Sequence, residues 1–363
     1  MITNASMITR ALALGFLFYI TLGANAQAAQ PNSAEQMFAM GSKLIKQDEL
    51  KRGISFLKKA SSKGHGRAAF ELASLYEVGL VVDKDFHLAK RYYEVSVRNG
   101  YRDAHFNLAL LLSSPMTPNN DLVRARNVVT VIAEQGDIEA QFLLATLMKS
   151  KLQGVPAKPG KAFYWLQHAA NSGHGQAQFQ LATQYMKGEH VSRSTKTALK
   201  WFRRAALQNI PSAHYNLAVM YDKGDGVSKN IATAVKWYQS AADLGSADAQ
   251  QNLGIKYLAG DDLEAKPKKA MELLTTAATS GSRDSQLLLG KLYHSGYRDQ
   301  IKKNLEKAEM WYLKAARQGK TEAQYQLALI LLEKENGSDE AIFWIRRAVA
   351  AGHVKAVQLQ ATL

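Results

Sequence analysis

The amino-acid sequence predicts an all-α solenoid of about nine helix pairs. Three observations predict this fold class. A glycine or asparagine recurs about every 36 residues and closes each repeat. Within a repeat, the first predicted helix carries a leucine between small residues, and the second predicted helix carries an aromatic ring. No Gly/Ser-rich or Pro-rich linker interrupts the pattern, since the 363 residues include only seven prolines. We therefore expect one elongated array rather than two separate domains.

The first recurring element is the residue that closes each repeat. The intervals between closing residues are 36, 36, 37, 36, 36, 36, 38 and 33. Glycine and asparagine tolerate a positive φ angle, so this position predicts a helix C-cap. The closing residues are Gly64, Gly100, Gly136, Gly173, Asn209, Gly245, Gly281, Gly319 and Gly352. His65, His174 and His353 each follow a closing glycine, and we interpret them as turn or cap residues rather than as metal ligands.

The second element is a predicted helix that carries a small residue, then leucine, a small residue and usually tyrosine. In the repeat 209–245 these residues are Ala213, Leu217, Ala218 and Tyr221. The spacing i, i+4, i+8 places three of them on one helical face, where small residues allow a neighbouring helix to approach. Two residues after the small residue an aromatic recurs, which helical periodicity assigns to packing rather than to partner contact. This aromatic set is Phe70, Phe106, Phe142, Phe179, Tyr215 and Tyr325.

The third element is a predicted helix in which alanine is followed three residues later by a large ring. All five tryptophans of the chain occupy this ring position: Trp165, Trp201, Trp237, Trp311 and Trp344. Large apolar residues at helical spacing usually pack in a core, so we interpret the tryptophans as structural anchors together with Gly173, Gly245 and Gly281. Stacking against a ligand is the alternative.

These elements together resemble the Sel-1-like repeat, a relative of the tetratricopeptide repeat with a period of 36 residues. The family pattern appears as AHYNLAVMYDKGDGV (213–227) and TAVKWYQSAADLG (233–245), and the resemblance covers about 290 residues. It implies a right-handed α-solenoid that binds protein partners on its concave face. The segment 101–136 departs from the pattern, because it has SSPMTPNND instead of the glycine loop and Val128 at the ring position. We expect this repeat to be irregular, or to introduce a bend.

Residues 1–28 have the order of a secretory signal peptide. Arg10 precedes the apolar run ALALGFLFYITLG, and ANA (24–26) and AQA (26–28) offer cleavage sites after residue 26 or 28. An uncleaved anchor is the alternative, although the run is shorter than the about 20 residues of a membrane span. The chain has no cysteine, so it cannot be an acylated lipoprotein. We expect a periplasmic or secreted protein with no transmembrane segment after processing.

The mature chain divides into three predicted parts. Residues 29–63 form an atypical N-terminal helix pair, in which Ser33 and Gln36 make a capping box. Residues 64–352 form the repeat solenoid. Residues 353–363 match the start of a further first helix, which either caps the array or presents an apolar end to a partner.

The formal net charge is +15, and part of the excess gathers on single helices. Lys196, Lys200, Arg203 and Arg204 lie at i, i+4, i+7 and i+8, on the predicted opposite face from Trp201, and Arg346 and Arg347 occupy equivalent positions. A solvated outer face is one interpretation. The other is a surface for anionic polysaccharide or lipid headgroups. Nucleic acid would suit the charge, but export from the cytoplasm and the absence of a nucleic-acid motif argue against it.

The sequence contains no HExxH, GxSxG or P-loop motif, and the single SxxK at 55–58 lacks its SDN and KTG companions. We therefore expect no enzyme, no cofactor and no metal site. The expected function is an exported scaffold or adaptor for unidentified protein partners in the bacterial cell envelope. The alternative is a basic binder of anionic envelope polymer, such as an accessory of exopolysaccharide assembly or export, a role that the family resemblance also allows.

Overall fold

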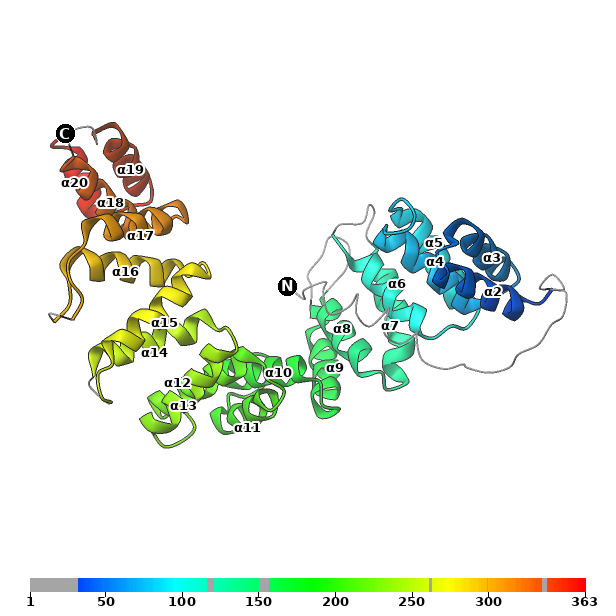
Figure 1. Ribbon diagram of the computed structural model, residues 1–363. Coiled ribbons are helices and arrows are strands. Elements are labelled where there is room, and N and C mark those ends of the chain that lie inside the picture. The colour runs from blue at the N-terminus through cyan, green and yellow to red at the C-terminus, as the bar shows by residue number, and fades with distance from the viewer. Residues whose placement is uncertain (1–31, 116–120, 150–156, 261–262, 299, 335–337) are drawn as a thin grey trace. The chain divides into compact units, whose positions relative to one another are not determined.

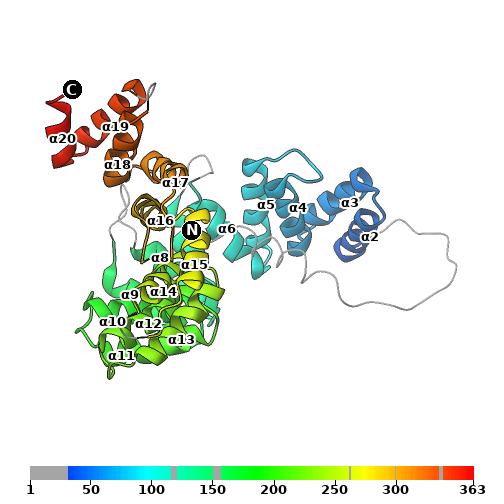
Figure 2. The same ribbon diagram turned by 60° about the vertical axis from the view of Figure 1, so that its left-hand side comes forward.

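The computed structural model describes residues 32–115, 121–149, 157–260, 263–298, 300–334 and 338–363 (Figure 1). The predicted signal peptide and its cleavage sites lie outside these ranges. Within them the chain forms an all-α solenoid, in which consecutive helices pack in pairs (Figure 1, Figure 2). The described residues contain no strand, only an isolated bridge between Tyr297 and Ile301. We call the two members of each pair the first and the second helix.

The chain divides into two compact units, residues 1–174 and residues 175–363. The division follows the closing residue Gly173, so it falls between two repeats and leaves the predicted repeat boundaries intact. Unit 1 contains four pairs among its described residues: α2 (Ala34–Lys46) with α3 (Leu50–Ser62), α4 (Gly66–Val78) with α5 (Phe86–Arg98), α6 (Asp103–Ser113) with α7 (Leu122–Glu134), and α8 (Ile138–Lys149) with α9 (Pro159–Asn171).

Unit 2 contains five pairs and one further helix within the described ranges. They are α10 (Gly175–Lys187) with α11 (Thr195–Ala206), α12 (Pro211–Lys223) with α13 (Ile231–Asp243), α14 (Ala247–Ala259) with α15 (Pro267–Thr279), α16 (Arg283–Ser295) with α17 (Leu305–Arg317), α18 (Thr321–Leu332) with α19 (Ser338–Ala350), and α20 (Val354–Gln360). Helix α20 begins at the predicted half-repeat, and Val354 and Val357 are exposed there. Whether this end is a cap or a docking surface stays a prediction.

The closing residues end the second helices as predicted, because each of them has a positive φ angle. The angle is +101° at Gly173, +87° at Gly245, +97° at Gly281 and +55° at Asn209. A Cβ added at Gly173, Gly245 or Gly281 would meet no atom within 4 Å. Glycine is therefore favoured at these positions by the backbone conformation and not by crowding.

The predicted helix caps at the N-termini are confirmed. Ser33 and Gln36 form the capping box at the start of α2. The Nδ1 atom of His65 accepts a hydrogen bond from the backbone N–H of Ala68 at 3.0 Å, and His353 does the same for Ala356 at 3.1 Å. These two histidines therefore act as N-cap residues of first helices.

A buried glutamine ties each of several first helices to the second helix before it. We call this contact the glutamine bracket: the residue after the small residue donates its Nε2–H to the backbone carbonyl eight residues earlier. The donors Gln141, Gln250, Gln286 and Gln324 reach Ala133, Ala242, Ala278 and Ala316 at 3.2, 3.1, 2.9 and 3.2 Å. In the repeat 209–245 the same position holds His214, whose Nε2 lies 2.9 Å from the carbonyl oxygen of Ala206. Each of the four alanine carbonyls also accepts the backbone N–H of the closing glycine three residues later, so the bracket adds a second donor at the helix end, where the regular intrahelical bonds stop.

In four repeats a buried ring occupies the position directly after the tryptophan position. These rings, Tyr93, Phe202, Tyr238 and Tyr312, lie four residues after the recurring alanine of their second helix, and all are at most 2% exposed. Trp311 and Trp344 are buried as well. Trp165, Trp201 and Trp237 are only half-buried and pack against the edges of the core clusters. The tryptophans therefore belong to the packing, but three of the five lie at its border.

The irregular repeat 101–136 keeps its helix pair. Its first helix, α6, has 11 residues instead of the usual 12 or 13. Arg126 of α7 is 7% exposed and donates from Nε to the carbonyl oxygen of Leu147 at 3.0 Å, which joins α7 to the end of α8. Burial lowers the pKa of the Arg126 guanidinium. The predicted bend stays a prediction.

Candidate functional site

The side chains of the first helices that the second helices leave uncovered form the first candidate surface. We call it the first-helix face. In unit 1 it includes Phe70, Glu71, Ser74, Glu77 and Asn107, and in unit 2 it includes Tyr215, Asp222, Asn252, Ile255, Lys256 and Gln326. Most of these side chains are half-buried and take part in hydrogen bonds that join neighbouring helices.

In unit 1 the face is organised around the buried hydroxyl group of Tyr93. This hydroxyl donates to Oε2 of Glu77 at 2.7 Å, accepts from Nδ2 of Asn107 at 3.2 Å, and lies 3.2 Å from Oγ of Ser74. Burial raises the pKa of Glu77 above its ordinary value, although the Tyr93 hydrogen bond and the charge of Lys84 act in the opposite direction. Burial also raises the pKa of Tyr93, so its hydroxyl stays a donor.

A second carboxylate, Glu71, lies six residues before Glu77 on the same helix. Its Oε2 accepts from Oγ of Ser42 at 3.3 Å, and its Oε1 lies 3.4 Å from Nε of Arg67. Burial raises the pKa of Glu71, and the charge of Arg67 partly offsets this shift. The first-helix face of unit 1 thus carries two carboxylates, of which Glu71 contacts Arg67, although the chain as a whole is strongly basic.

In unit 2 the face carries an internal ion pair. Nζ of Lys256 lies 2.7 Å from Oδ1 of Asp222, and the two side chains are 20% and 19% exposed. Oδ2 of Asp222 accepts from the hydroxyl of Tyr238 at 3.3 Å. Asn252 donates to the hydroxyl of Tyr215 at 3.1 Å, so side chains of α14 hold side chains of α12. Hydrogen bonds and an ion pair within the chain therefore hold the polar groups of this face in place.

The predicted aromatic set takes part in packing. Phe142 is 7% exposed and stacks on His174 at a centroid distance of 4.2 Å, and Tyr325 stacks on His353 at 4.6 Å. The Nε2 atoms of these histidines also reach carboxylates of the preceding repeat, Glu139 at 3.4 Å and Glu322 at 3.1 Å. The other members, Phe70, Phe106, Phe179 and Tyr215, are half-buried. Contacts between first helices thus account for the histidines that follow the closing glycines.

The predicted basic surface on α11 exists, with two modifications. Lys196, Lys200, Arg203 and Arg204 are all exposed, and α11 contains no acidic residue. However, the guanidinium of Arg204 covers the ring of Trp201 at 4.6 Å, so Trp201 does not lie on the opposite face from Arg204. Arg203 donates from Nη2 to the hydroxyl of Tyr221. Among the described residues, no carboxylate lies within ion-pair distance of Lys196, Lys200 or Arg204.

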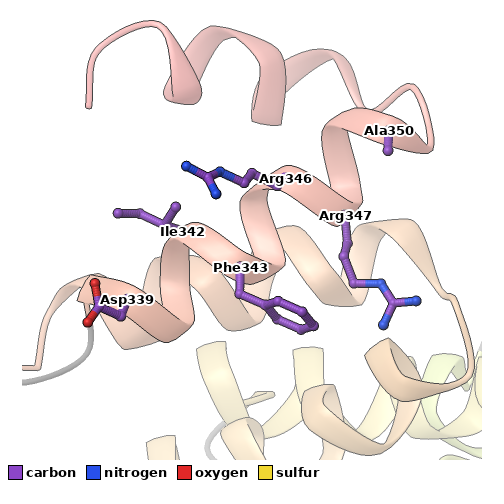
Figure 3. Close-up of a pocket in the computed structure, with 6 residues that line it drawn as sticks. All are labelled: Asp339, Ile342, Phe343, Arg346, Arg347 and Ala350. Carbon is purple, nitrogen blue, oxygen red and sulfur yellow. The ribbon is translucent and has the colours of Figure 1, made fainter.

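Arg346 and Arg347 lie on α19 beside an open pocket of about 480 Å³. Asp339, Ile342, Phe343 and Ala350 complete its lining, so one helix supplies every lining residue. Figure 3 shows Phe343 and Arg347 on the same side of α19, with Arg346 pointing away from them. The guanidinium of Arg347 lies 5.6 Å from the centroid of Phe343. Three helix pairs and helix α18 separate α11 from α19 along the chain (Figure 1). Arg346 and Arg347 therefore belong to a different repeat from the cations of α11.

The described ranges contain no group of three or more His, Asp or Glu side chains that could hold a metal ion. No helix in these ranges is long and apolar enough to cross a bilayer. The surfaces described above offer charged groups, hydrogen-bonding groups and apolar contact area.

Paired helices, closing residues with positive φ and surfaces made of helix faces define a helical-repeat protein. The family model of the Sel1 repeat matches residues 28–65, 66–101, 138–174, 175–210, 211–246, 247–282, 283–320 and 321–353. The chain therefore belongs to the Sel1 repeat family. The matches leave out 102–137, the repeat in which the glycine loop is missing.

Two solved structures resemble the chain over most of its length. A Sel1 repeat protein from Oxalobacter formigenes is 30% identical with a TM-score of 0.71, over 82% of this chain and 86% of that one. A protective antigen present in uropathogenic Escherichia coli strains, which displays an SLR fold, is 26% identical with a TM-score of 0.69, over 89% and 70% of the two chains. A search of curated proteins finds no match. Sel1 repeat proteins generally mediate protein–protein interaction, and their fold is typical of non-catalytic scaffolds.

Proposed function

We propose that this protein is an exported scaffold of the bacterial cell envelope that holds protein partners on its first-helix face. The observation that carries the proposal is the set of hydrogen bonds between successive first helices, such as Asn252 to Tyr215 and Lys256 to Asp222. Side chains that are already fixed lose little conformational entropy when a partner binds. A face of this kind therefore favours stable recognition.

Export is supported by the sequence of residues 1–28, with Arg10, the apolar run and the small-residue cleavage sites. Cell fractionation would test it, with mass spectrometry of the N-terminus of the recovered protein. A mature N-terminus at residue 27 or 29 in the periplasm or the medium supports export. Full-length protein in the cytoplasmic fraction would contradict it.

A crosslinked pull-down from cell envelope with the mature protein, residues 29–363, tests the scaffold function. A discrete protein partner retained at high salt is the expected result, because contacts through fixed hydrogen bonds and apolar groups resist screening. Recovery of polysaccharide or lipid that is lost at high salt would instead favour the anionic-polymer function described below.

Two variants of equal exposure locate the partner within unit 2. Ile255 on the first helix α14 and Met310 on the second helix α17 are each 41% exposed. We expect Ile255→Arg to reduce recovery of the partner and Met310→Arg to leave it unchanged. Loss of the partner with Met310→Arg alone would place the binding surface on the second helices and refute this assignment.

A second function, binding of anionic envelope polymer, is favoured by Lys196, Lys200 and Arg204 of α11, which form no ion pair with a carboxylate of the described ranges. The variant Lys196→Gln, Lys200→Gln, Arg204→Gln should lower salt-dependent retention on alginate or heparin. The matched control replaces Lys236, Lys268 and Lys302, which are also exposed but lie on separate repeats, and removes the same charge. Equal losses in both variants would mean that only net charge matters and that α11 is not a site.

A further inference from the structure

Two places in the chain carry the same network of carboxylate, tyrosine and asparagine. In unit 1 the members are Glu77, Tyr93 and Asn107, and in unit 2 they are Asp222, Tyr238 and Asn252. An offset of 145 residues separates each pair of equivalent positions: 77 and 222, 93 and 238, 107 and 252, 111 and 256. Because four repeats span this offset, the equivalent residues occupy the same places in their repeats.

The two networks differ at the fourth pair of positions. In unit 2 this position is Lys256, whose ammonium group lies 2.7 Å from Asp222. In unit 1 it is Leu111, which is 4% exposed and cannot neutralise a charge. The ion pair in unit 2 shows that an ammonium group fits beside the carboxylate in this arrangement, and unit 1 lacks that group.

The remaining surroundings of Glu77 do not replace the missing cation. No basic group of the described chain forms an ion pair with Glu77 within 4 Å, and exposed Lys84 influences it only over a longer distance. The Tyr93 hydroxyl supplies one hydrogen bond at 2.7 Å to a single carboxylate oxygen. A half-buried carboxylate with one neutral donor is electrostatically costly, and an added cation would relieve this cost.

We propose that Glu77, held by Tyr93 beside Ser74 and Asn107, receives the ammonium group of a lysine side chain from a protein partner. The ammonium group would make for Glu77 the kind of contact that Lys256 makes for Asp222 in unit 2, approaching from the solvent side because Leu111 fills the equivalent internal position. This inference rests on the proposed scaffold function and names the partner's chemistry: the segment that contacts unit 1 is basic. The net charge of +15 would by itself attract an acidic partner. The basic segment is instead selected by the local network around Glu77.

The neighbourhood of Glu77 supports a basic segment rather than a single amine. Glu71 lies six residues before Glu77 on α4 and adds a second carboxylate to this region, although it also contacts Arg67. Phe70 packs against Tyr93 at a centroid distance of 5.7 Å and provides an apolar edge beside it. The methylene stem of a lysine needs such a surface while its ammonium group reaches the carboxylate.

The test uses fluorescein-labelled octalysine and its fully Nε-acetylated counterpart, titrated into mature protein at low salt with anisotropy as the readout. Glu77→Gln keeps the shape and the acceptor for Tyr93 but removes the charge, and should weaken octalysine binding about tenfold. Leu111→Lys supplies an internal ammonium group and should block the site similarly. The acetylated peptide should bind at least tenfold more weakly than octalysine to the unaltered protein.

Two controls separate the site from general charge effects. Glu134→Gln removes an exposed carboxylate of α7, and Val131→Lys adds a cation at a position that is 45% exposed. Each should change the affinity by about twofold or less. Equal weakening by Glu77→Gln and Glu134→Gln would overturn the proposal, even if the pull-down identifies a partner. If the buried Leu111→Lys variant unfolds, Glu77→Gln still decides the outcome.

Discussion

The substitution Gly290→Ala tests whether the contacts of a single repeat or the pattern shared by the repeats better predicts a change in stability. Gly290 of α16 occupies a position where α12 and α18 have Ala218 and Ala328. The repeat pattern alone therefore predicts a tolerated change, and helix propensity predicts a gain of about 1 kcal/mol in the free energy of unfolding. The structure predicts the opposite sign.

A Cβ atom at Gly290 would lie 2.4 Å from Cδ1 and 2.5 Å from Cε1 of Tyr312. Carbon atoms in contact normally stay about 3.5 Å apart, so the ring would have to move by about 1 Å. Tyr312 is 1% exposed, so close-packed neighbours oppose a movement of its ring. Overpacking of this kind costs about 1–3 kcal/mol, and the short contact favours the upper part of that range. We expect a net loss of about 1–2 kcal/mol after the propensity gain is subtracted.

Urea unfolding measures the change in stability, and hydrogen exchange of residues 283–320 localises it to the repeat. The comparison variant is Gly254→Ala, where the nearest atom is Cγ of Leu274 at 2.9 Å, so the overlap is less severe than with the ring of Tyr312. That variant should lose less stability than Gly290→Ala. In a protein that already carries Tyr312→Leu, adding Gly290→Ala should lower the free energy of unfolding much less than it does in the unaltered protein. Stabilisation by Gly290→Ala alone would refute the packing argument.

Three further outcomes are expected from stability measurements. Gln250→Met should lower the free energy of unfolding by about 1–2 kcal/mol, because the carbonyl of Ala242 loses the hydrogen bond of the glutamine bracket. Gln180→Met, at a half-buried position, should lower it less, and urea titrations of the two variants test this difference. Burial raises the pKa of Glu322, but hydrogen bonds from His353 and Gln326 outweigh it and the net pKa lies below its ordinary 4.5. The ionised carboxylate therefore stabilises the fold above pH 4.5, and this contribution disappears as the pH falls through the lower folded pKa. Melting curves recorded between pH 6 and 3 should show a loss of stability in acid, and the loss should be smaller in Glu322→Gln. The folded pKa of Glu77 is raised instead, so Glu77→Gln should melt at a higher temperature than the unaltered protein at pH 7, and this advantage should vanish below pH 4.5.

Much of the fold could be predicted because helix ends and helix faces leave periodic signals. The closing residues, the capping box of Ser33 and Gln36, and the capping role of His65 follow from local backbone chemistry, and the structure confirms them. The glutamine bracket was missed, although an Ala-Gln pair recurs at the start of several first helices. The tryptophan position was predicted to be the core position, but the most deeply buried ring is the next residue. Helical periodicity identifies the buried face of a helix and does not show where that face ends.

The candidate site was harder to predict because it depends on contacts between repeats. Helical spacing correctly placed the cations of α11 on an exposed face. It could not show that Arg203 bonds to Tyr221, which belongs to the next repeat. The network around Glu77 likewise combines residues from α4, α5 and α6, and only their packing brings them together. Comparison of positions 111 and 256 reveals a missing cation only after the neighbouring hydrogen bonds are known.

The glutamine bracket has a consequence for how this chain can change over generations. Its donor and acceptor are a buried amide and a backbone carbonyl, and neither belongs to the uncovered first-helix side chains. Substitutions on that uncovered side therefore leave the joint between repeats intact. Each repeat can then alter its exposed side chains separately while the array keeps its architecture. Duplication followed by local divergence would then produce new partner specificity with little risk to folding.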